Sequence, residues 1–159
     1  VLTARMQPDE TLAFPYENIL IPTDGSDGAA RGAEHGLALA AALDATVHAL
    51  AVVEDDPVGP DVRSVPLAEA RAGVADEALS DLAAMVEEYA LDGVVRHVKQ
   101  GRLVDGILAT VEAEEIDGVV MGTTGRQGTE GILLGSVAEN TVRSAPVPVI
   151  TVADPSPGE

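Results

Sequence analysis

Hydrophobic positions follow two alternating patterns along this chain. Short runs of apolar and β-branched residues, bounded by polar or turn-forming residues, predict five buried strands at 19–22, 45–54, 94–98, 117–122 and 147–152. The segments between them, with apolar residues three and four apart in the longer ones, predict four helices at 27–43, 67–90, 103–115 and 136–144. Ser26 or Asp27 offers the oxygen that caps the first of these helices.

The regular alternation of strand and helix predicts one α/β domain. Because short connections and right-handed crossovers make such strands parallel, we expect an open doubly wound, Rossmann-like sheet of five strands in a three-layer sandwich. The strand order 3-2-1-4-5 is expected by analogy with such folds. Residues 16–153 form the predicted domain, 1–15 a flexible N-terminal tail and 154–159 a polar C-terminal tail, and the proline-rich stretch 55–66 is expected to be a loop.

Composition supports this fold class and excludes several kinds of site. Hydrophobic residues make up 46% of the chain but aromatic ones only 2%, which is typical of Val, Leu, Ile and Ala cores between parallel strands and helices. The absence of cysteine excludes disulfides and thiolate metal sites and suits a reducing compartment. No apolar run approaches the length of about 20 residues that spans a bilayer, and no signal-peptide pattern is seen. We therefore expect a cytoplasmic protein without a membrane partner.

The chain is strongly acidic, with 27 Asp and Glu against 9 Lys and Arg and a formal net charge of -18. Only Lys99 is a lysine. Such a field repels polyanions, so no nucleic-acid partner is expected. The lysine-poor, acidic composition resembles that of haloarchaeal proteins, which function in molar salt; an acidic domain of an ordinary mesophile is the alternative.

Two loops carry the candidate chemistry. Open parallel sheets bind ligands beyond the carboxyl ends of their strands, and the loop "PTDGSDG" follows the first strand while a glycine-rich loop follows the fourth. In the second loop, Gly122 and Gly125 are separated by two residues, and Gly135 and Ser136 follow after nine more. Glycines let main-chain amides point inward as an anion nest, and the helix that begins at Ser136 adds further amides. Phosphate is the predicted guest, and a purely structural turn is the alternative.

Three segments carry a family resemblance: "ILIPTDGS", "ALAVVE" and "VVMGTTGRQGTEGILLGSVAENTVRSAPVPVITV". Together they resemble the nucleotide-binding, or ATP-binding, branch of the universal stress protein family, whose signature is G-x2-G-x9-G-[ST] and whose fold is adenine nucleotide alpha hydrolase-like. The resemblance implies a domain that binds ATP or AMP, with Mg²⁺ accompanying the nucleotide. It also implies a homodimer formed through the fifth strand, Val147 to Val152.

The resemblance also assigns roles to individual residues. Asp24 matches the position that holds the ribose or the adenine edge, and Pro22 and Thr23 match the pocket wall. Val52 and Val53 match the strand end that contacts adenine through its backbone. The phosphate and ribose loop corresponds to Met121, Gly122, Gly125, Arg126, Gly135, Ser136 and Val137. Alternatives are a helix-entry cap for Asp24, core packing for the two valines and a solvated surface position for Arg126.

No catalytic residue and no metal site are predicted. His35, His48 and His97 lie on a predicted helix and two predicted strands without metal-ligand spacing, and no Walker A or G-x-G-x-x-G motif is present. Thr124 stands where relatives often carry a histidine, and a hydroxyl cannot shuttle protons near neutral pH. We therefore expect a nucleotide-dependent regulatory protein of the stress response. The alternatives are a slow ATPase and a nucleotide-free dimeric scaffold.

Overall fold

Strands and helices alternate through the computed structural model, which describes residues 14–53, 64–123 and 135–153. A 3₁₀ turn, η1 (Glu87–Tyr89), follows the second of the helices. In chain order the other elements are β1 (Asn18–Pro22), α2 (Asp27–Leu43), β2 (Thr46–Val53), α3 (Ser64–Val86), β3 (Val94–Gln100), α4 (Leu103–Ala113), β4 (Gly118–Gly122), α5 (Ser136–Ser144) and β5 (Val149–Val152).

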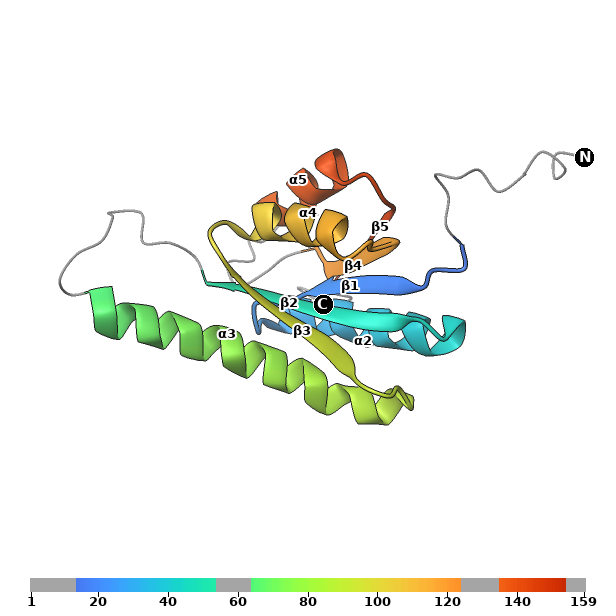
Figure 1. Cartoon of the computed structure of the whole chain (residues 1–159), viewed down its shortest axis with the longest axis horizontal. Coiled ribbons are helices and arrows are strands. Elements are labelled where there is room, and N and C mark those ends of the chain that lie inside the picture. The colour runs from blue at the N-terminus through green and yellow to red at the C-terminus, as the bar shows by residue number, and fades with distance from the viewer. Residues whose placement is uncertain (1–13, 54–63, 124–134, 154–159) are drawn as a thin grey trace, which may run out of the picture.

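The five strands form one parallel sheet in the order β3-β2-β1-β4-β5, which confirms the predicted topology. Helices α2 and α3 cover one face of the sheet and α4 and α5 cover the other, so the molecule has three layers (Figure 1). Each face has its own apolar core. Ile19, Ile21 and Leu37 are fully buried on the α2 and α3 side, and Leu20, Leu50 and Ile107 are fully buried on the α4 and α5 side.

The helix after β2 begins earlier than its apolar pattern predicts. Helix α3 starts at Ser64, so the prediction of a loop through residue 66 is wrong for its last three positions. Pro66 is tolerated there because first-turn amides have no intrahelical partner to lose.

The fifth strand is also shorter than predicted. It begins at Val149. Pro148 has no N–H to donate, but its carbonyl oxygen accepts a hydrogen bond from the Val119 N–H at 3.0 Å.

Helix α2 approaches the sheet through glycines spaced four apart, Gly28, Gly32 and Gly36. A Cβ placed on Gly32 would lie 2.6 Å from the Gly122 nitrogen, and one placed on Gly36 would lie 2.7 Å from Cδ1 of Ile21. Since real side chains do not tolerate such distances, these glycines set how closely α2 packs on β4 and β1. The apolar periodicity alone did not predict this stripe.

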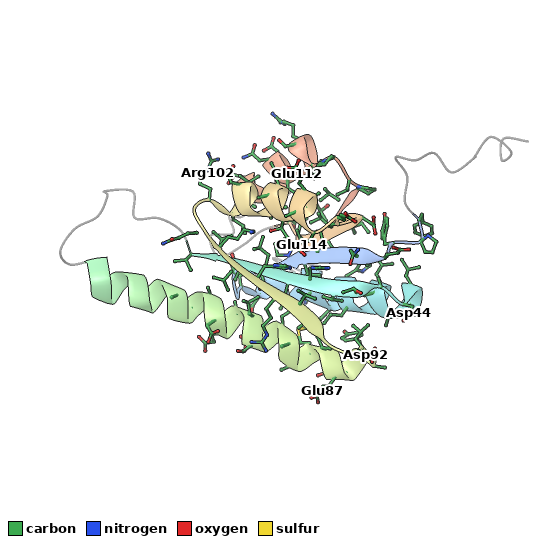
Figure 2. All side chains as sticks on the ribbon, viewed as in Figure 1. Asp44, Glu87, Asp92, Arg102, Glu112 and Glu114 are labelled. Atoms are coloured by element: carbon green, nitrogen blue, oxygen red, sulfur yellow. The ribbon has the colours of Figure 1, made fainter. Side chains whose placement is uncertain are left out.

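Acidic side chains dominate the described surface. Asp44, Glu87, Asp92 and Glu112 are all exposed and point away from the core (Figure 2). None of the helices in the described ranges combines the length and apolar character needed to cross a membrane.

Candidate functional site

The two predicted loops begin at the carboxyl ends of adjacent strands. β1 and β4 are neighbours in the sheet, with Leu20 paired to Val119. After β1 the chain crosses to the face covered by α2, whereas after β4 it crosses to the face covered by α5 (Figure 1). This is the switch point at which open α/β sheets leave a crevice for ligands.

The loop after β1 is held by its own hydrogen bonds. Thr23 is buried, and its N–H donates to the Leu50 carbonyl at 2.9 Å, while its Oγ1 accepts from the Gly25 N–H at 3.1 Å. The Ser26 N–H donates to Oδ1 of Asp24 at 2.9 Å, and Gly25 adopts a φ of +80°. Asp24 thus closes a turn that leads into α2, while the cap of that helix is Ser26. The same bond fixes its carboxylate at the end of β1, beside the buried Pro22.

The residues that end β4 pack differently from the expected phosphate loop. Met121 is buried in the core on the α4 and α5 side. The missing side chain of Gly122 faces helix α2, where a Cβ would collide with the carbonyl oxygen of Gly28. The absence of a side chain at Gly122 is thus required by helix packing, whereas the sequence suggested a close approach to a ligand.

The start of α5 presents main-chain donors for which the described residues provide no acceptor. Gly135 occupies the N-cap position with extended φ and ψ of −72° and 169°, and its N–H donates to the Thr123 carbonyl at 2.5 Å. Among the described residues no side chain caps this helix, whereas Oγ of Ser26 caps α2 by accepting from Ala29 at 3.1 Å. Because first-turn amides have no intrahelical acceptor, Ser136 and Val137 provide N–H groups that suit an anion.

Two candidate positions, Gly125 and Arg126, lie outside the described residues, as does Thr124. Val52 and Val53 lie at the end of β2 as predicted, but each packs against the core on one side of the sheet. The Val53 carbonyl accepts a hydrogen bond from the Gly101 N–H at 3.0 Å, so this carbonyl already has a partner just after β3. These contacts favour the core-packing interpretation of the two valines.

Comparison with known proteins identifies the family. The universal stress protein family matches residues 15–153. The chain belongs to this family. A universal stress protein of Methanocaldococcus jannaschii is 41% identical over 145 residues, covering 88% of this chain and 84% of the relative.

Solved universal stress proteins share the fold of this chain. The universal stress protein UspA from Lactobacillus plantarum has a TM-score of 0.78 at 27% identity, covering 86% of this chain and 97% of that one. The universal stress protein from Archaeoglobus fulgidus in complex with dAMP has a TM-score of 0.64 at 21% identity, covering 86% and 97%. At that identity the second comparison shows a common fold.

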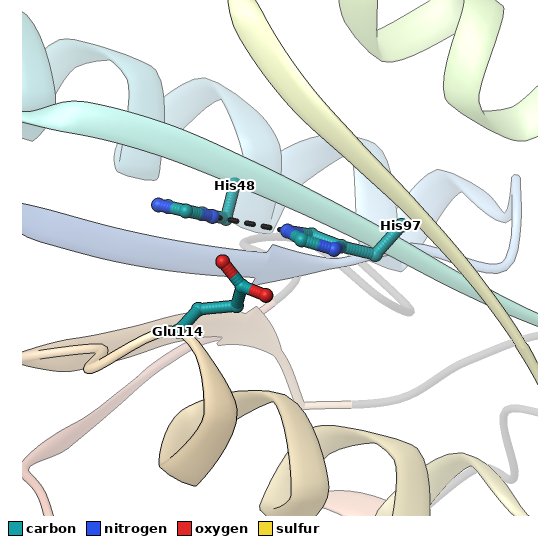
Figure 3. Close-up of side chains that lie close together, drawn as sticks. All are labelled: His48, His97 and Glu114. Carbon is teal, nitrogen blue, oxygen red and sulfur yellow. Dashed lines mark hydrogen bonds between the residues drawn. The ribbon is translucent and has the colours of Figure 1, made fainter.

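This universal stress protein also has a histidine cluster that the sequence did not predict. Nδ1 of His48 on β2 lies 3.0 Å from Nε2 of His97 on β3, and Nε2 of His48 lies 3.0 Å from Oδ1 of Asn18 on β1. The two ring planes are 9° apart. Figure 3 shows the Glu114 carboxylate, just after α4, pointing toward the two rings.

Burial and charge both act on the titration of this cluster. His48 is only 6% exposed, and desolvation followed by the charge of His97 lowers the pKa of His48 below its ordinary value of 6.5. Glu114 acts in the opposite direction by favouring the charged ring. The net result is a buried imidazole that is neutral near pH 7.

Proposed function

We propose that the chain binds an adenine nucleotide, ATP or AMP, where β1 and β4 end, and that it acts as a nucleotide-dependent regulatory protein. The observation that carries the proposal is the start of α5, which no side chain in the described ranges caps and which follows the glycine-spaced sequence after β4. Binding of dAMP by the Archaeoglobus fulgidus relative supports an adenine nucleotide as the ligand. Mg²⁺ would accompany the phosphates of ATP.

Main-chain donors explain how so acidic a chain can hold a phosphate. The first-turn N–H groups of Ser136 and Val137 need no cationic side chain, and the helix dipole adds a partial positive charge. Glu139 is the acidic residue of this turn, and its carboxylate is paired with Arg143 at 2.9 Å. The charge of this carboxylate is therefore balanced by a cation one turn further along α5.

We also propose that regulation involves a homodimer formed through β5. The carbonyls of Pro148 and Val152 point toward β4, where they accept from Val119 and Thr123. Because main-chain groups alternate along a strand, those of Val149 and Thr151 point to the outer edge, and no other described strand pairs with that edge. A second β5 can pair there, which also covers an otherwise open edge.

The proposed role is a switch, with no catalytic turnover as its main activity. Nucleotide would stabilise one arrangement of the chain by its differential affinity and so change the affinity for a partner. The sequence has no Walker A lysine and has Thr124 where relatives often carry histidine, so slow hydrolysis at most is expected. Phosphate release measured with ATP and Mg²⁺ in molar salt distinguishes this switch from an ATPase.

A proline substitution at the start of α5 tests the proposed phosphate site directly. Ser136→Pro removes one main-chain N–H, yet proline is favoured at the first position of a helix, and the ψ of 169° at Gly135 suits a residue before proline. Loss of a charge-assisted hydrogen bond worth about 1.5–3 kcal/mol should weaken ATP binding roughly 10- to 100-fold. Isothermal titration in molar KCl with Mg²⁺ measures the change.

Ser136→Ala is the matched control, because it removes the hydroxyl and keeps the amide. We expect it to bind ATP more tightly than Ser136→Pro, with both variants unfolding at similar temperatures. Equal ATP affinity of Ser136→Pro and the wild type would refute the proposed site. Absence of ATP and AMP binding by the wild type would favour the nucleotide-free scaffold instead.

A further inference from the structure

The histidine cluster brings together residues from three separate parts of the chain. His48 is on β2, His97 is on β3 and Glu114 directly follows α4. One nitrogen from each ring and one carboxylate oxygen all lie within 4.8 Å of one another. Among the described residues this is the one group of three or more His, Asp or Glu side chains with such convergence.

Two of the three side chains, those of His48 and Glu114, lie toward the amino ends of β1 and β4, whereas His97 is the middle residue of β3 and lies opposite Leu50. His48 is the third residue of β2, and its partner across β1 is Leu20, two residues before Pro22 ends that strand. Glu114 ends the helix that leads back to the start of β4, where the Asp117 N–H donates to the Asn18 carbonyl at 2.8 Å. None of the three is a residue proposed to bind the nucleotide, so the cluster can be tested separately from nucleotide binding.

The hydrogen bond to Asn18 fixes which nitrogen of His48 carries a lone pair. With Oδ1 of Asn18 as the acceptor, the N–H of His48 is on Nε2 and the lone pair on Nδ1 points toward His97. Metal-binding histidines are oriented in this way, with the other ring N–H held by an oxygen. Without an ion, Nε2–H of His97 donates to that lone pair across 3.0 Å.

We propose that His48, His97 and Glu114 bind a divalent transition-metal ion of the zinc class. The ion takes the place of the shared proton between Nδ1 of His48 and Nε2 of His97, and His97 then carries its proton on Nδ1. Zinc bonds of about 2.0–2.1 Å in a tetrahedral site place neighbouring ligand atoms about 3.3 Å apart. The two ring nitrogens are already 3.0 Å apart, so they need to separate only slightly.

Glu114 completes the site and sets its charge. Its side chain is partly exposed and has three rotatable bonds, so its carboxylate can close the remaining distance toward the rings. Two imidazoles and one carboxylate favour zinc, copper or nickel over Mg²⁺ and Ca²⁺, which prefer all-oxygen sites. Three protein ligands leave a coordination position for water. The bound ion would link the edge strand β3 to β2 and to the end of α4.

Titration with Zn²⁺ tests the site in the 159-residue chain. The protein is stripped with a chelator, dialysed, and titrated calorimetrically in molar KCl with excess Mg²⁺, which occupies weak carboxylate sites on this acidic surface. We expect one tightly bound Zn²⁺ per chain. His97→Gln and Glu114→Gln should each weaken binding by at least tenfold, because even outer residues of metal sites contribute about 10- to 100-fold.

Two exposed residues provide matched controls. His35→Gln on α2 and Glu112→Gln on α4 remove the same chemical groups outside the cluster and should leave Zn²⁺ affinity unchanged. In addition, Zn²⁺ should raise the unfolding temperature of the wild type but not that of His97→Gln. The proposal fails if the wild type binds Zn²⁺ no more tightly than His97→Gln, or if the control variants lose affinity to the same extent. ATP binding is unaffected by either outcome, so the two proposals are tested separately.

Discussion

Gly32 of α2 lies directly against the main chain of Gly122 in β4, so that a Cβ on Gly32 would stand 2.6 Å from the Gly122 nitrogen. This relationship joins the fold to the candidate site. Gly122 is the last residue of β4 and the first glycine of the family signature, and α2 begins at the end of the loop that contains Asp24. The packing of two backbones therefore fixes where β4 ends relative to the first turns of α2.

Gly32→Ala should destabilise the protein. The added methyl group meets backbone atoms that cannot rotate away, and overpacking of this kind typically costs about 1–3 kcal/mol of unfolding free energy. Urea denaturation measures the loss. Gly73→Ala on α3 is the control, because a Cβ there has open space around it and alanine favours a helix over glycine by about 0.5–1 kcal/mol. Equal stabilities of Gly32→Ala and the wild type would contradict the close packing.

Thr151→Pro should dissociate the proposed homodimer. The Thr151 N–H points to the outer edge of β5, so its loss leaves the hydrogen bonds to β4 in place while proline blocks pairing with a second chain. We expect light scattering in high salt to show a dimeric wild type and a monomeric variant. A wild type that is monomeric at micromolar concentration would refute the dimer, and Ile150→Pro, which faces β4, should instead unfold the sheet edge.

Low salt should unfold the protein. A net charge of -18, carried on exposed side chains such as Asp44, Glu87 and Asp92, produces repulsion that molar salt screens to a length of about 3 Å. Circular dichroism during dilution from molar KCl should show loss of helix as the salt falls. A neutral solute at the same osmolality is the control and should not restore the fold. Retention of the full signal in dilute buffer would argue for an ordinary acidic domain.

Lowering the pH should destabilise the folded chain through the buried His48. The pKa of His48 in the folded chain is lowered by desolvation and by His97, so the unfolded chain binds a proton first as the pH falls. This titration leaves the free energy of unfolding unchanged above the unfolded pKa of about 6.5. As the pH falls from there toward the folded pKa, the free energy of unfolding decreases.

Urea denaturation of the metal-free protein at about pH 7.5 and about pH 5.5 measures this loss. His48→Gln removes the titrating ring that faces His97, Glu114 and Asn18, so its free energy of unfolding should fall less than that of the wild type. Protonation of surface carboxylates affects both proteins alike. Identical pH dependence in the two proteins would show that His48 does not contribute.

The fold could be predicted because local periodicity and chain connectivity determine it. Ile19 to Pro22 and the strand at 118–122 are short apolar runs followed by turn residues, and short crossovers force such strands to be parallel. The positions of the two candidate loops follow from the same argument, since each loop directly follows a strand. The start of α3 was missed because Pro66 looks like a loop residue, although it is tolerated within a first helical turn.

Contacts that depend on packing between distant segments could not be read from the sequence. The role of Gly122 depends on where α2 lies against β4, which no local pattern encodes. The pairing of His48 with His97 depends on the register between β2 and β3, in which Leu50 lies opposite His97. A signal was nevertheless present, because both histidines lie on strands that the predicted order makes neighbours.

The outer edge of β5 presents the main-chain N–H and C=O groups of Val149 and Thr151. Main-chain groups are chemically the same in all proteins. Hydrogen bonds along this edge therefore cannot tell a second copy of this chain from a different protein with the same exposed edge. Any preference for a second copy of this chain must come from neighbouring side chains, such as the exposed Val142 on α5. A few surface residues would then control whether related chains exchange subunits.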